Sequence, residues 1–249
     1  MFRLTAIAAL MSGSTAMAGG FVPPVVETPI EITEVAPVPA WEGMYVGGTL
    51  GYGFGGDDKV GTTVNGFNRG NMGDLEISGG NYGLHAGYRW QRPVKDKYQW
   101  VFAGELGYEA GGLGDDVDSV MDIMGSSMDG TASVDVNSVL ALRVKSGVLN
   151  QAGDTWFYGI AGVGMIDYDY AIALNNASTR YSTSYDGESA TGYILGLGVE
   201  HKFDEKWSVT GEWEYQNYGK ETIGDKNSGI STEATPDWHQ IKIGLNYQF

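Results

Sequence analysis

The segment WHQIKIGLNYQF, residues 238–249, alternates between apolar and polar side chains. One set of alternate positions is apolar and consists of Ile241, Ile243, Leu245, Tyr247 and Phe249. The intervening positions are mostly polar and include Gln240, Lys242, Asn246 and Gln248. Because successive side chains of a β-strand point to opposite faces, this period of two predicts a strand that separates an apolar environment from a polar one.

Seven further segments repeat the alternation, and we predict strands over residues 44–54, 81–90, 98–110, 136–148, 155–170, 191–203 and 207–218. The side chains expected on the apolar outer face include Leu50, Leu84, Leu106, Leu142, Leu197 and Trp213. In segment 155–170 both faces carry apolar residues. We place Trp156, Tyr158, Ile160, Ile166 and Tyr168 outside, although Phe157, Val163 and Met165 lie on the other face.

The connections between these strands alternate in length. Residues 91–97, 150–154 and 204–206 form short connections, whereas residues 55–80, 111–135, 171–190 and 219–236 form long ones. Short turns at one end and long loops at the other are typical of an up-and-down barrel in an outer membrane, with the short turns in the periplasm. The sequence therefore predicts an all-β, eight-stranded antiparallel up-and-down transmembrane β-barrel. A soluble β-sandwich, the alternative, has no reason to sort its loops by length.

The aromatic residues support the membrane interpretation. Trp90, Tyr98, Trp100, Trp156, Trp207, Tyr247 and Phe249 fall at the expected periplasmic ends of strands. Tyr52, Tyr82, Tyr108, Tyr168 and Tyr215 fall towards the opposite ends. Two aromatic belts are expected where a barrel crosses the two membrane interfaces.

The first forty residues have a different composition. Residues 1–18 combine Arg3, a short apolar run and the small-residue sequence Ala16-Met17-Ala18, which is the pattern of a cleaved secretory signal. Residues 19–40 contain five prolines and read as an extended periplasmic linker, with a tether that contacts a partner as the alternative. The barrel domain is expected over residues 41–249.

Composition excludes several classes of function. A net charge of −16 argues against nucleic-acid binding. The absence of cysteine excludes disulfides, a thiol nucleophile and cysteine metal ligands. Thirty-nine glycines and a mean hydropathy of −0.19 argue that any membrane crossing uses strands and not helices. No cofactor or metal ion is expected.

Charged residues alternate onto the expected inner face of the barrel. The positive set is Arg89, Arg143, Lys145, Lys202 and Lys242, and the negative set is Glu105, Glu109, Glu200, Glu212 and Glu214. Because an eight-stranded barrel has room only for its own side chains and unpaired buried charge is costly, we expect an ion-pair network that closes the lumen. The alternative is a narrow ion path lined by the same groups.

The second long loop contains Asp115, Asp116, Asp118, Asp122 and Asp129. Their spacing does not match a calcium-binding loop, so a solvated acidic surface is the preferred interpretation. Val117, Val120, Met121 and Met124 recur at helical spacing between acidic residues and Gly125, which predicts a short amphipathic helix at the extracellular mouth. Its apolar stripe would cap the barrel or contact a partner.

An enzyme would need a nucleophile, a base and an orienting acid close together. Of the three histidines, His85 is expected inside the barrel and His201 and His239 outside, and none has an obvious serine and acid partner at a matching depth. We therefore expect no catalytic residues.

Several motifs resemble those of the small outer-membrane β-barrel family of opacity-type and OmpA-type proteins, in particular alphaproteobacterial porin-family barrels. They are WEGMYVG at 41–47, LGYG at 50–53, GLHAGY at 83–88, GELGY at 104–108 and GLGVE at 196–200. The resemblance covers residues 41–249 and implies an eight-stranded barrel in the bacterial outer membrane. It also implies that the terminal strand, with Ile243, Leu245, Tyr247 and Phe249, is read as a signal by the outer-membrane assembly machinery. No peptidoglycan-binding domain is expected after Phe249.

These observations together predict an outer-membrane protein with a structural role and extracellular loops that meet the environment or a host. Its expected partners are outer-membrane lipid, the assembly machinery and a possible partner of the extracellular loops. A small-solute porin is the alternative, and a lipid-modifying enzyme is a third and weaker one.

Overall fold

The computed structural model describes residues 40–56, 58–64, 67–94, 98–123, 126–175, 180–219, 221–225 and 230–249. The signal expected at residues 1–18 and the linker, except its last residue Ala40, lie outside the described residues and remain predictions. Among the described residues, no helix is long and apolar enough to cross a membrane.

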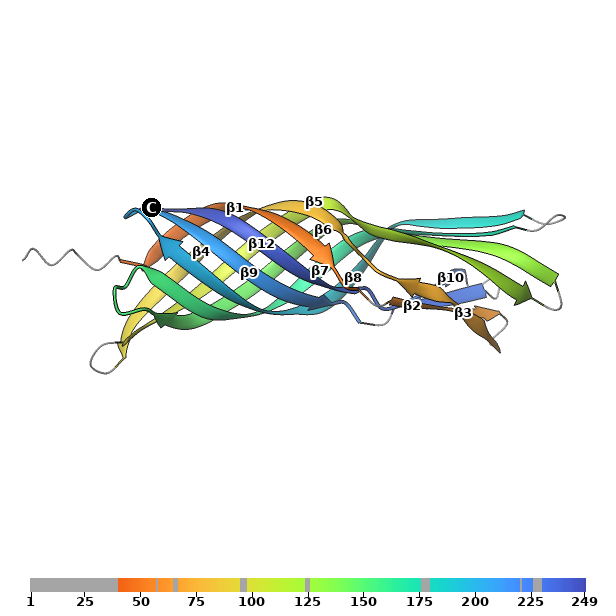
Figure 1. Ribbon diagram of the computed structural model, residues 1–249, viewed down its shortest axis with the longest axis horizontal. Coiled ribbons are helices and arrows are strands. Elements are labelled where there is room, and N and C mark those ends of the chain that lie inside the picture. The colour runs from red at the N-terminus through yellow and green to blue at the C-terminus, as the bar shows by residue number, and fades with distance from the viewer. Residues whose placement is uncertain are drawn as a thin grey trace, which may run out of the picture. The chain divides into compact units, whose positions relative to one another are not determined.

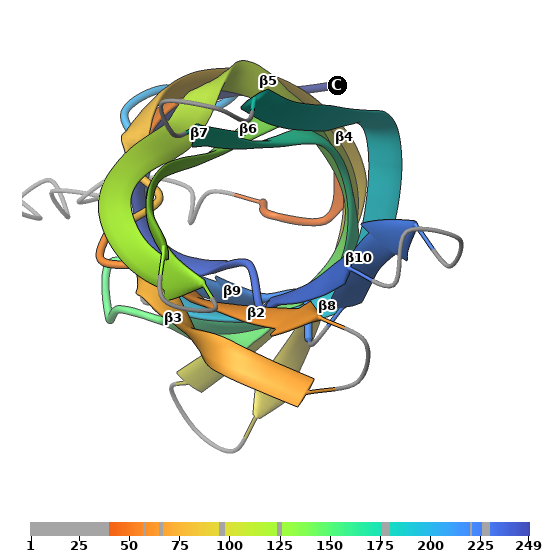
Figure 2. The same ribbon diagram turned by 90° about the vertical axis from the view of Figure 1, so that its right-hand side faces the viewer.

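Eight antiparallel strands close into a barrel in the order β1-β12-β9-β8-β7-β6-β5-β4 (Figures 1 and 2). Their bounds are β1 Gly43–Phe54, β4 Gly79–Val94, β5 Tyr98–Ile123, β6 Ser126–Leu149, β7 Thr155–Asn175, β8 Arg180–Lys202, β9 Trp207–Asn217 and β12 Asp237–Gln248. Strand β1 pairs with β4 on one side and with the carboxy-terminal strand β12 on the other, which closes the ring. The predicted eight-stranded barrel is therefore confirmed.

Two of the long connections contain further strands. Strands β2 (Asp58–Val64) and β3 (Phe67–Leu75) lie between β1 and β4, and β10 (Glu221–Asp225) and β11 (Ile230–Ala234) lie between β9 and β12. They form a separate four-stranded sheet in the order β10-β11-β2-β3. Two segments far apart in the sequence are thus joined at the end of the barrel that carries the long connections, which we call the long-loop end.

The helix predicted near residues 115–124 is wrong over residues 115–123, because β5 runs as a strand to Ile123 and pairs with β6, while Met124 and Gly125 lie outside the described residues. The register continues through Val117↔Ala132 and Val120↔Asp129. Val117 packs inside, whereas Val120 is 73% exposed, so the two residues lie on opposite faces of a strand and form no helical stripe. Pairing with β6 supplies hydrogen-bond partners for a segment rich in Asp, Val, Ser and Gly, which are weak helix formers.

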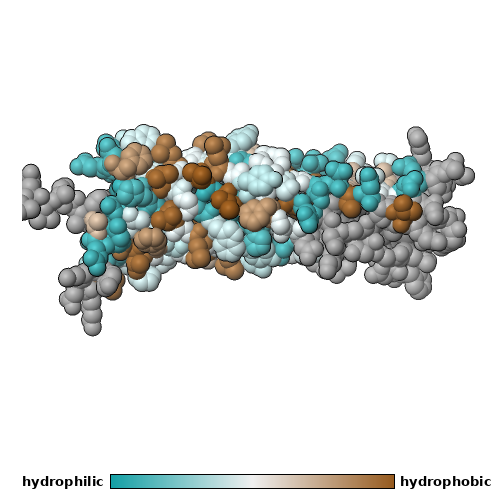
Figure 3. Space-filling view, viewed as in Figure 1, coloured by the Kyte–Doolittle hydropathy of each residue, from teal (hydrophilic) through white to brown (hydrophobic). Residues whose placement is uncertain are grey.

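The outer wall is apolar as predicted on seven of the eight strands. Leu50, Leu84, Leu106, Leu142 and Leu197 are all at least 55% exposed on the barrel surface. Figure 3 shows apolar side chains gathered over the barrel strands, with hydrophilic ones prominent beyond them. A belt of Trp90, Trp207 and Phe249 lies at the opposite end, which carries the short connections and is called here the short-turn end.

Strand β7 has the reverse orientation to the one we predicted. Trp156, Tyr158, Ile160, Ile166 and Tyr168 are at most 4% exposed and point into the barrel. Phe157, Val163 and Met165 face outward. Trp156 and Tyr168 therefore do not belong to the aromatic belts. The reason is that this wall of the lumen is filled by rings, and Gly198 on the neighbouring strand leaves room for the Tyr158 ring.

Candidate functional site

The candidate site is the interior of the barrel, to which every strand of the ring contributes alternate side chains. All ten charged residues that the sequence placed on the inner face lie inside, each at most 6% exposed. They are Arg89, Glu105, Glu109, Arg143, Lys145, Glu200, Lys202, Glu212, Glu214 and Lys242.

Seven of the ten form one continuous network across the barrel. Lys145 Nζ lies 2.7 Å from both Glu105 and Glu212. Lys242 Nζ then joins this group to the next, because it lies 3.4 Å from Glu212 and 2.7 Å from Glu214.

Arg143 completes the network. It pairs with Glu109 and donates from Nη2 to Glu214 over 3.0 Å. Lys242 also reaches Glu109, at 3.4 Å. The network thus contains four carboxylates and three cations from strands β5, β6, β9 and β12.

Neutral side chains occupy the remaining hydrogen-bonding capacity of the carboxylates. Tyr45 Oη donates to Glu105 over 2.8 Å, and Tyr158 Oη donates to Glu212 over 2.6 Å. Gln240 and Gln216 donate to Glu109 and Glu214, respectively. Buried carboxylates with several donors are far less costly than isolated ones, so this arrangement can be stable inside the barrel.

The other three charges lie towards the short-turn end. Arg89 Nη2 is 2.7 Å from Glu200, which also accepts hydrogen bonds from Ser208 and Asn246. Lys202 donates to the backbone carbonyls of Ala40, over 2.7 Å, and Glu205, over 3.2 Å.

An apolar cluster closes the short-turn side of the charge network. We call it the lower cluster, and it consists of Trp41, Tyr45, Val101, Ala103, Leu149, Trp156, Tyr158 and Ile160. Trp41 is fully buried and donates from Nε1 to the Gly153 carbonyl over 2.7 Å. Arg89 and Lys202 lie against its ring, 5.5 and 5.2 Å from the centroid. The first residue of the expected barrel domain, Trp41, therefore fills this mouth of the barrel.

A second apolar cluster lies on the other side of the network, towards the long-loop end. This upper cluster contains Ile77, Leu113, Ala132, Val134, Val136, Val139, Ala141, Ile166, Tyr168, Tyr170, Ala190, Ile194, Tyr218 and Trp238. Tyr218 stacks on Trp238 at 5.1 Å, and the Tyr218 hydroxyl donates to Gln216 beside the charge network. Three layers thus succeed one another along the lumen: apolar, charged and apolar.

The histidines lie where the sequence placed them. His85 points inward and contacts Asn246 over 2.7 Å. His239 faces outward and stacks on Trp213 at 5.5 Å.

His201 has neighbours that sequence reasoning did not find. Its Nδ1 lies 3.0 Å from the Thr155 hydroxyl and 3.9 Å from Asp154. Thr155 also donates to Asp154 over 2.8 Å, and these bonds, with one from Asn150, hold the pKa of Asp154 below its usual value. The hydroxyl and the acid both face the same ring nitrogen of His201, whereas a catalytic triad needs them on different nitrogens, so the order of a triad is not formed.

Sequence reasoning did not count among the site residues the aromatic and amide side chains that complete the interior, namely Trp41, Tyr45, Trp156, Tyr158, Gln216, Tyr218, Trp238 and Gln240. It did place Gln240 on the polar face of the terminal strand, and Tyr45 had a usable signal, since it lies between the outward residues Met44 and Val46. Trp156 and Tyr158 had none, because apolar residues occupy both faces of β7.

An antiparallel eight-stranded ring with an apolar outer wall, an aromatic belt and a charged interior defines an outer-membrane β-barrel protein. The chain belongs to the outer membrane protein beta-barrel domain family, which it matches over residues 6–249. It lies in the bacterial outer membrane, where the short-turn end is periplasmic and the long-loop end extracellular.

Named relatives agree with this assignment. The chain is 27% identical over 216 residues to the 31 kDa outer-membrane immunogenic protein of Brucella melitensis, covering 84% of each chain. It is 26% identical over 223 residues to the 22 kDa outer membrane protein of Rhizobium leguminosarum bv. viciae, covering 86% of this chain and 81% of the relative. Among solved structures, OprG of Pseudomonas aeruginosa has a similar fold, with a TM-score of 0.52 and 16% identity over 84% of this chain and 96% of that one.

Proposed function

We propose that this protein is a structural component of the outer membrane whose lumen is closed and whose extracellular part interacts with the surroundings of the cell. The observation that carries the closed lumen is the succession of three filled layers inside the barrel: the lower cluster, the charge network and the upper cluster.

The pairing of the lumen charges favours this function over a small-solute pore. A conducting path needs polar groups that contact water and passing solutes. Here the carboxylates are turned towards cations and donors of the barrel itself, at 2.7 Å for three of the pairs with lysine. Separating such buried partners would leave each ion with an uncompensated desolvation penalty of several kcal/mol.

The extracellular side supports a surface interaction. Strands β5 to β8 run from 21 to 26 residues, more than the 9–11 residues or so that a tilted strand needs to cross a bilayer. Asp116, Asp118 and Asp129 are exposed on this extension. The Brucella relatives are named immunogenic outer-membrane proteins, which fits a family whose long-loop end meets host molecules.

We propose no enzymatic activity. The cluster of His201, Thr155 and Asp154 lies at the periplasmic turn before β7, and its hydroxyl is hydrogen-bonded to the acid. This arrangement suits a turn that is tied to the neighbouring strand. Replacing His201 by Gln should leave hydrolysis of phospholipid esters by the purified barrel at the background level of empty vesicles.

The terminal strand serves as the proposed assembly signal. Ile243 and Leu245 project from the outer wall of β12, and Phe249 directly after it is exposed as well, so a folding factor can bind all three before lipid covers them. Replacing Phe249 by Ser should slow insertion in cells while leaving the refolded barrel in detergent unchanged. If Phe249→Ser and the wild type were inserted at equal rates, the terminal strand would not act as an assembly signal through Phe249.

A solute-release assay tests the closed lumen. Vesicles that contain the refolded barrel and trapped small sugars or amino acids should retain them as protein-free vesicles do. Vesicles with a known porin serve as the positive control, and heat-dependent mobility on electrophoresis shows that the barrel has inserted. Release that rises with the amount of folded barrel would favour the small-solute porin.

A genetic experiment tests the structural role. Cells without the protein should become more sensitive to detergents, and a barrel whose β5–β8 extension is shortened should restore resistance. If the shortened barrel restores resistance but no longer binds the host surface, the two roles are separated. Unchanged detergent sensitivity in the deletion strain would contradict the structural role.

A further inference from the structure

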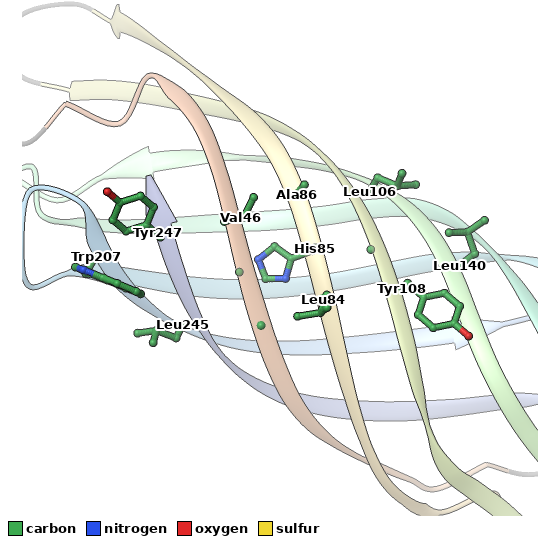
Figure 4. Close-up of a pocket in the computed structure, with 13 residues that line it drawn as sticks. Val46, Leu84, His85, Ala86, Leu106, Tyr108, Leu140, Trp207, Leu245 and Tyr247 are labelled. Atoms are coloured by element: carbon green, nitrogen blue, oxygen red, sulfur yellow. The ribbon is translucent and has the colours of Figure 1, made fainter. Parts of the chain in front are cut away.

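The outer wall of the barrel carries an apolar groove of about 680 Å³ that the closed lumen does not explain. Its lining residues come from β1, β4, β5, β6, β9 and β12. Figure 4 shows Trp207, Tyr247 and Leu245 at one end and Tyr108 and Leu140 at the other.

The groove exists because small residues stand where the strands around it carry large ones. Gly48 lies between Leu245 of β12 and Leu84 of β4 in the strand register. A Cβ atom placed at Gly48 would have only ordinary contacts, the nearest at 3.7 Å, so the space above it is open. Ala86, also in the lining, adds little to fill it.

The periplasmic end of the groove carries a cation. Lys206 Nζ donates to the Tyr247 hydroxyl over 3.4 Å and lies 5.8 Å from the centre of its ring. Tyr247 packs edge-on against Trp207 at 5.0 Å, and both rings line the groove. Asp204 and Glu205 precede Lys206 and are exposed as well, but Lys206 Nζ is the charged group that contacts Tyr247, so it can receive a negatively charged group there.

Membrane lipid matches both the apolar groove and the cation at its periplasmic end. Lipid chains are as apolar as the groove, so apolar contact alone would not hold one chain in preference to its neighbours. Close packing along a groove together with one charge-assisted contact would do so. We propose that the groove binds one acyl chain of a glycerophospholipid of the periplasmic leaflet, with the lipid phosphate at Lys206 and the interfacial rings of Trp207 and Tyr247 beside its glycerol.

A second copy of the chain fits the groove less well. A two-fold contact uses the same surface on both partners, so an axis through the groove would set one hollow against the other. A lipid chain fills the hollow without this difficulty.

Native mass spectrometry of the full barrel, released from vesicles, tests the proposal. The vesicles contain palmitoyl-oleoyl phosphatidylethanolamine and phosphatidylglycerol with palmitoyl-oleoyl glycerol as a phosphate-free probe. The wild-type barrel should retain one phospholipid. Gly48→Leu fills the groove and should lower this occupancy at least tenfold, whereas Lys206→Gln should lower phospholipid occupancy and leave the phosphate-free lipid unchanged.

Gly211→Leu is the matched control. Gly211 lies on the outer face of β9, outside the lining of the groove, and a Cβ there would meet only Val199, at 3.9 Å. It should retain lipid as the wild type does. Heat-dependent mobility on electrophoresis confirms that each variant is folded.

Two outcomes would overturn the proposal. Equal lipid occupancy in the wild type, Gly48→Leu and Gly211→Leu would mean that the barrel carries only unspecific surrounding lipid. A dimer signal that Gly48→Leu alone abolishes would mean that a second copy occupies the groove.

Discussion

At the scale of single residues, the charges inside the barrel are stable only in combination. Arg89 and Glu200 form a compact example, because their side chains are at most 2% exposed and lie 2.7 Å apart. Removing one partner leaves the other buried without compensation, which is usually more damaging than removing both.

Replacing Arg89 by Met should therefore lower the free energy of unfolding by about 3–5 kcal/mol, because Glu200 loses its cation. Urea titration of the barrel in detergent micelles measures the change. The double variant Arg89→Met/Glu200→Met is the control and should recover most of the loss. A single variant as stable as the wild type would contradict the network as described.

The periplasmic turn at Asp154 offers a prediction of pH dependence. Hydrogen bonds from Thr155 and Asn150 hold the pKa of Asp154 below its unfolded value of about 3.9. A lowered pKa means that the ionised acid contributes stability above that unfolded value, and that the contribution is lost as the pH falls through the folded pKa.

Asp154→Asn should thus lower the urea midpoint at pH 7 and approach the wild-type midpoint below about pH 4. Urea titration at a series of pH values checks this expectation. A difference in midpoint that stays constant from pH 7 to pH 3 would show that the charge of Asp154 is not involved.

At the scale of elements, alternation of side chains predicts strands well where only one face is apolar. Strand β12 is such a case, since its outward Ile243 and Leu245 alternate with buried Lys242 and Asn246. The method fails on β7, where Phe157 and Tyr158 are both apolar enough for either side. The choice there depends on what nearby strands supply to the lumen, namely the carboxylate of Glu212 on β9 for the Tyr158 hydroxyl.

The extension of β5 and β6 was not predictable for a related reason. Helical spacing of valine and methionine is weak evidence in a short segment, and the partner strand decides the outcome. Because β6 pairs with β5 in continuous register, the backbone of residues Asp115 to Asp118 forms its hydrogen bonds with β6 and does not need a helix.

Spin labels on single cysteines test the orientation of β7, and the cysteine-free chain makes the labelling unambiguous. A label at Val163→Cys should be relaxed strongly by oxygen dissolved in the lipid, because Val163 is 55% exposed on the outer wall. A label at Ile160→Cys, which is 4% exposed, should be shielded from oxygen and from a water-soluble relaxing agent. Strong relaxation by oxygen at position 160 and shielding at position 163 would contradict this structure and support the orientation of β7 that the sequence predicted.

At the scale of the whole molecule, we propose that the barrel is closed by three successive layers, which hydrogen bonds from Tyr45, Tyr158 and Tyr218 link to one another. The sequence predicted the central layer, because lysine, arginine and glutamate appear at inward positions on several strands. It did not predict the apolar layers, since a tryptophan at position 41 or 238 can equally belong to a membrane belt. Only the closing of the ring shows that these rings point inward.

Trp41→Ala should lower the free energy of unfolding by about 3–5 kcal/mol, as expected for loss of a buried indole. It should nevertheless leave the barrel impermeable, because the charge network and the upper cluster still fill the lumen. Thermal unfolding and trapped-solute release on the same preparation separate the two effects. Solute release from this variant alone would show that Trp41 is the only barrier.

The closed lumen is the central claim, and single-channel recording tests it most directly. The barrel of residues 19–249, refolded and shown to be inserted by its heat-dependent mobility, is placed in a planar lipid bilayer under an applied voltage. We predict a silent recording for the wild-type protein, because each layer of the lumen is filled by side chains that contact one another. Steady and reproducible conductance steps would contradict the closed lumen and make the buried charges the lining of an ion path.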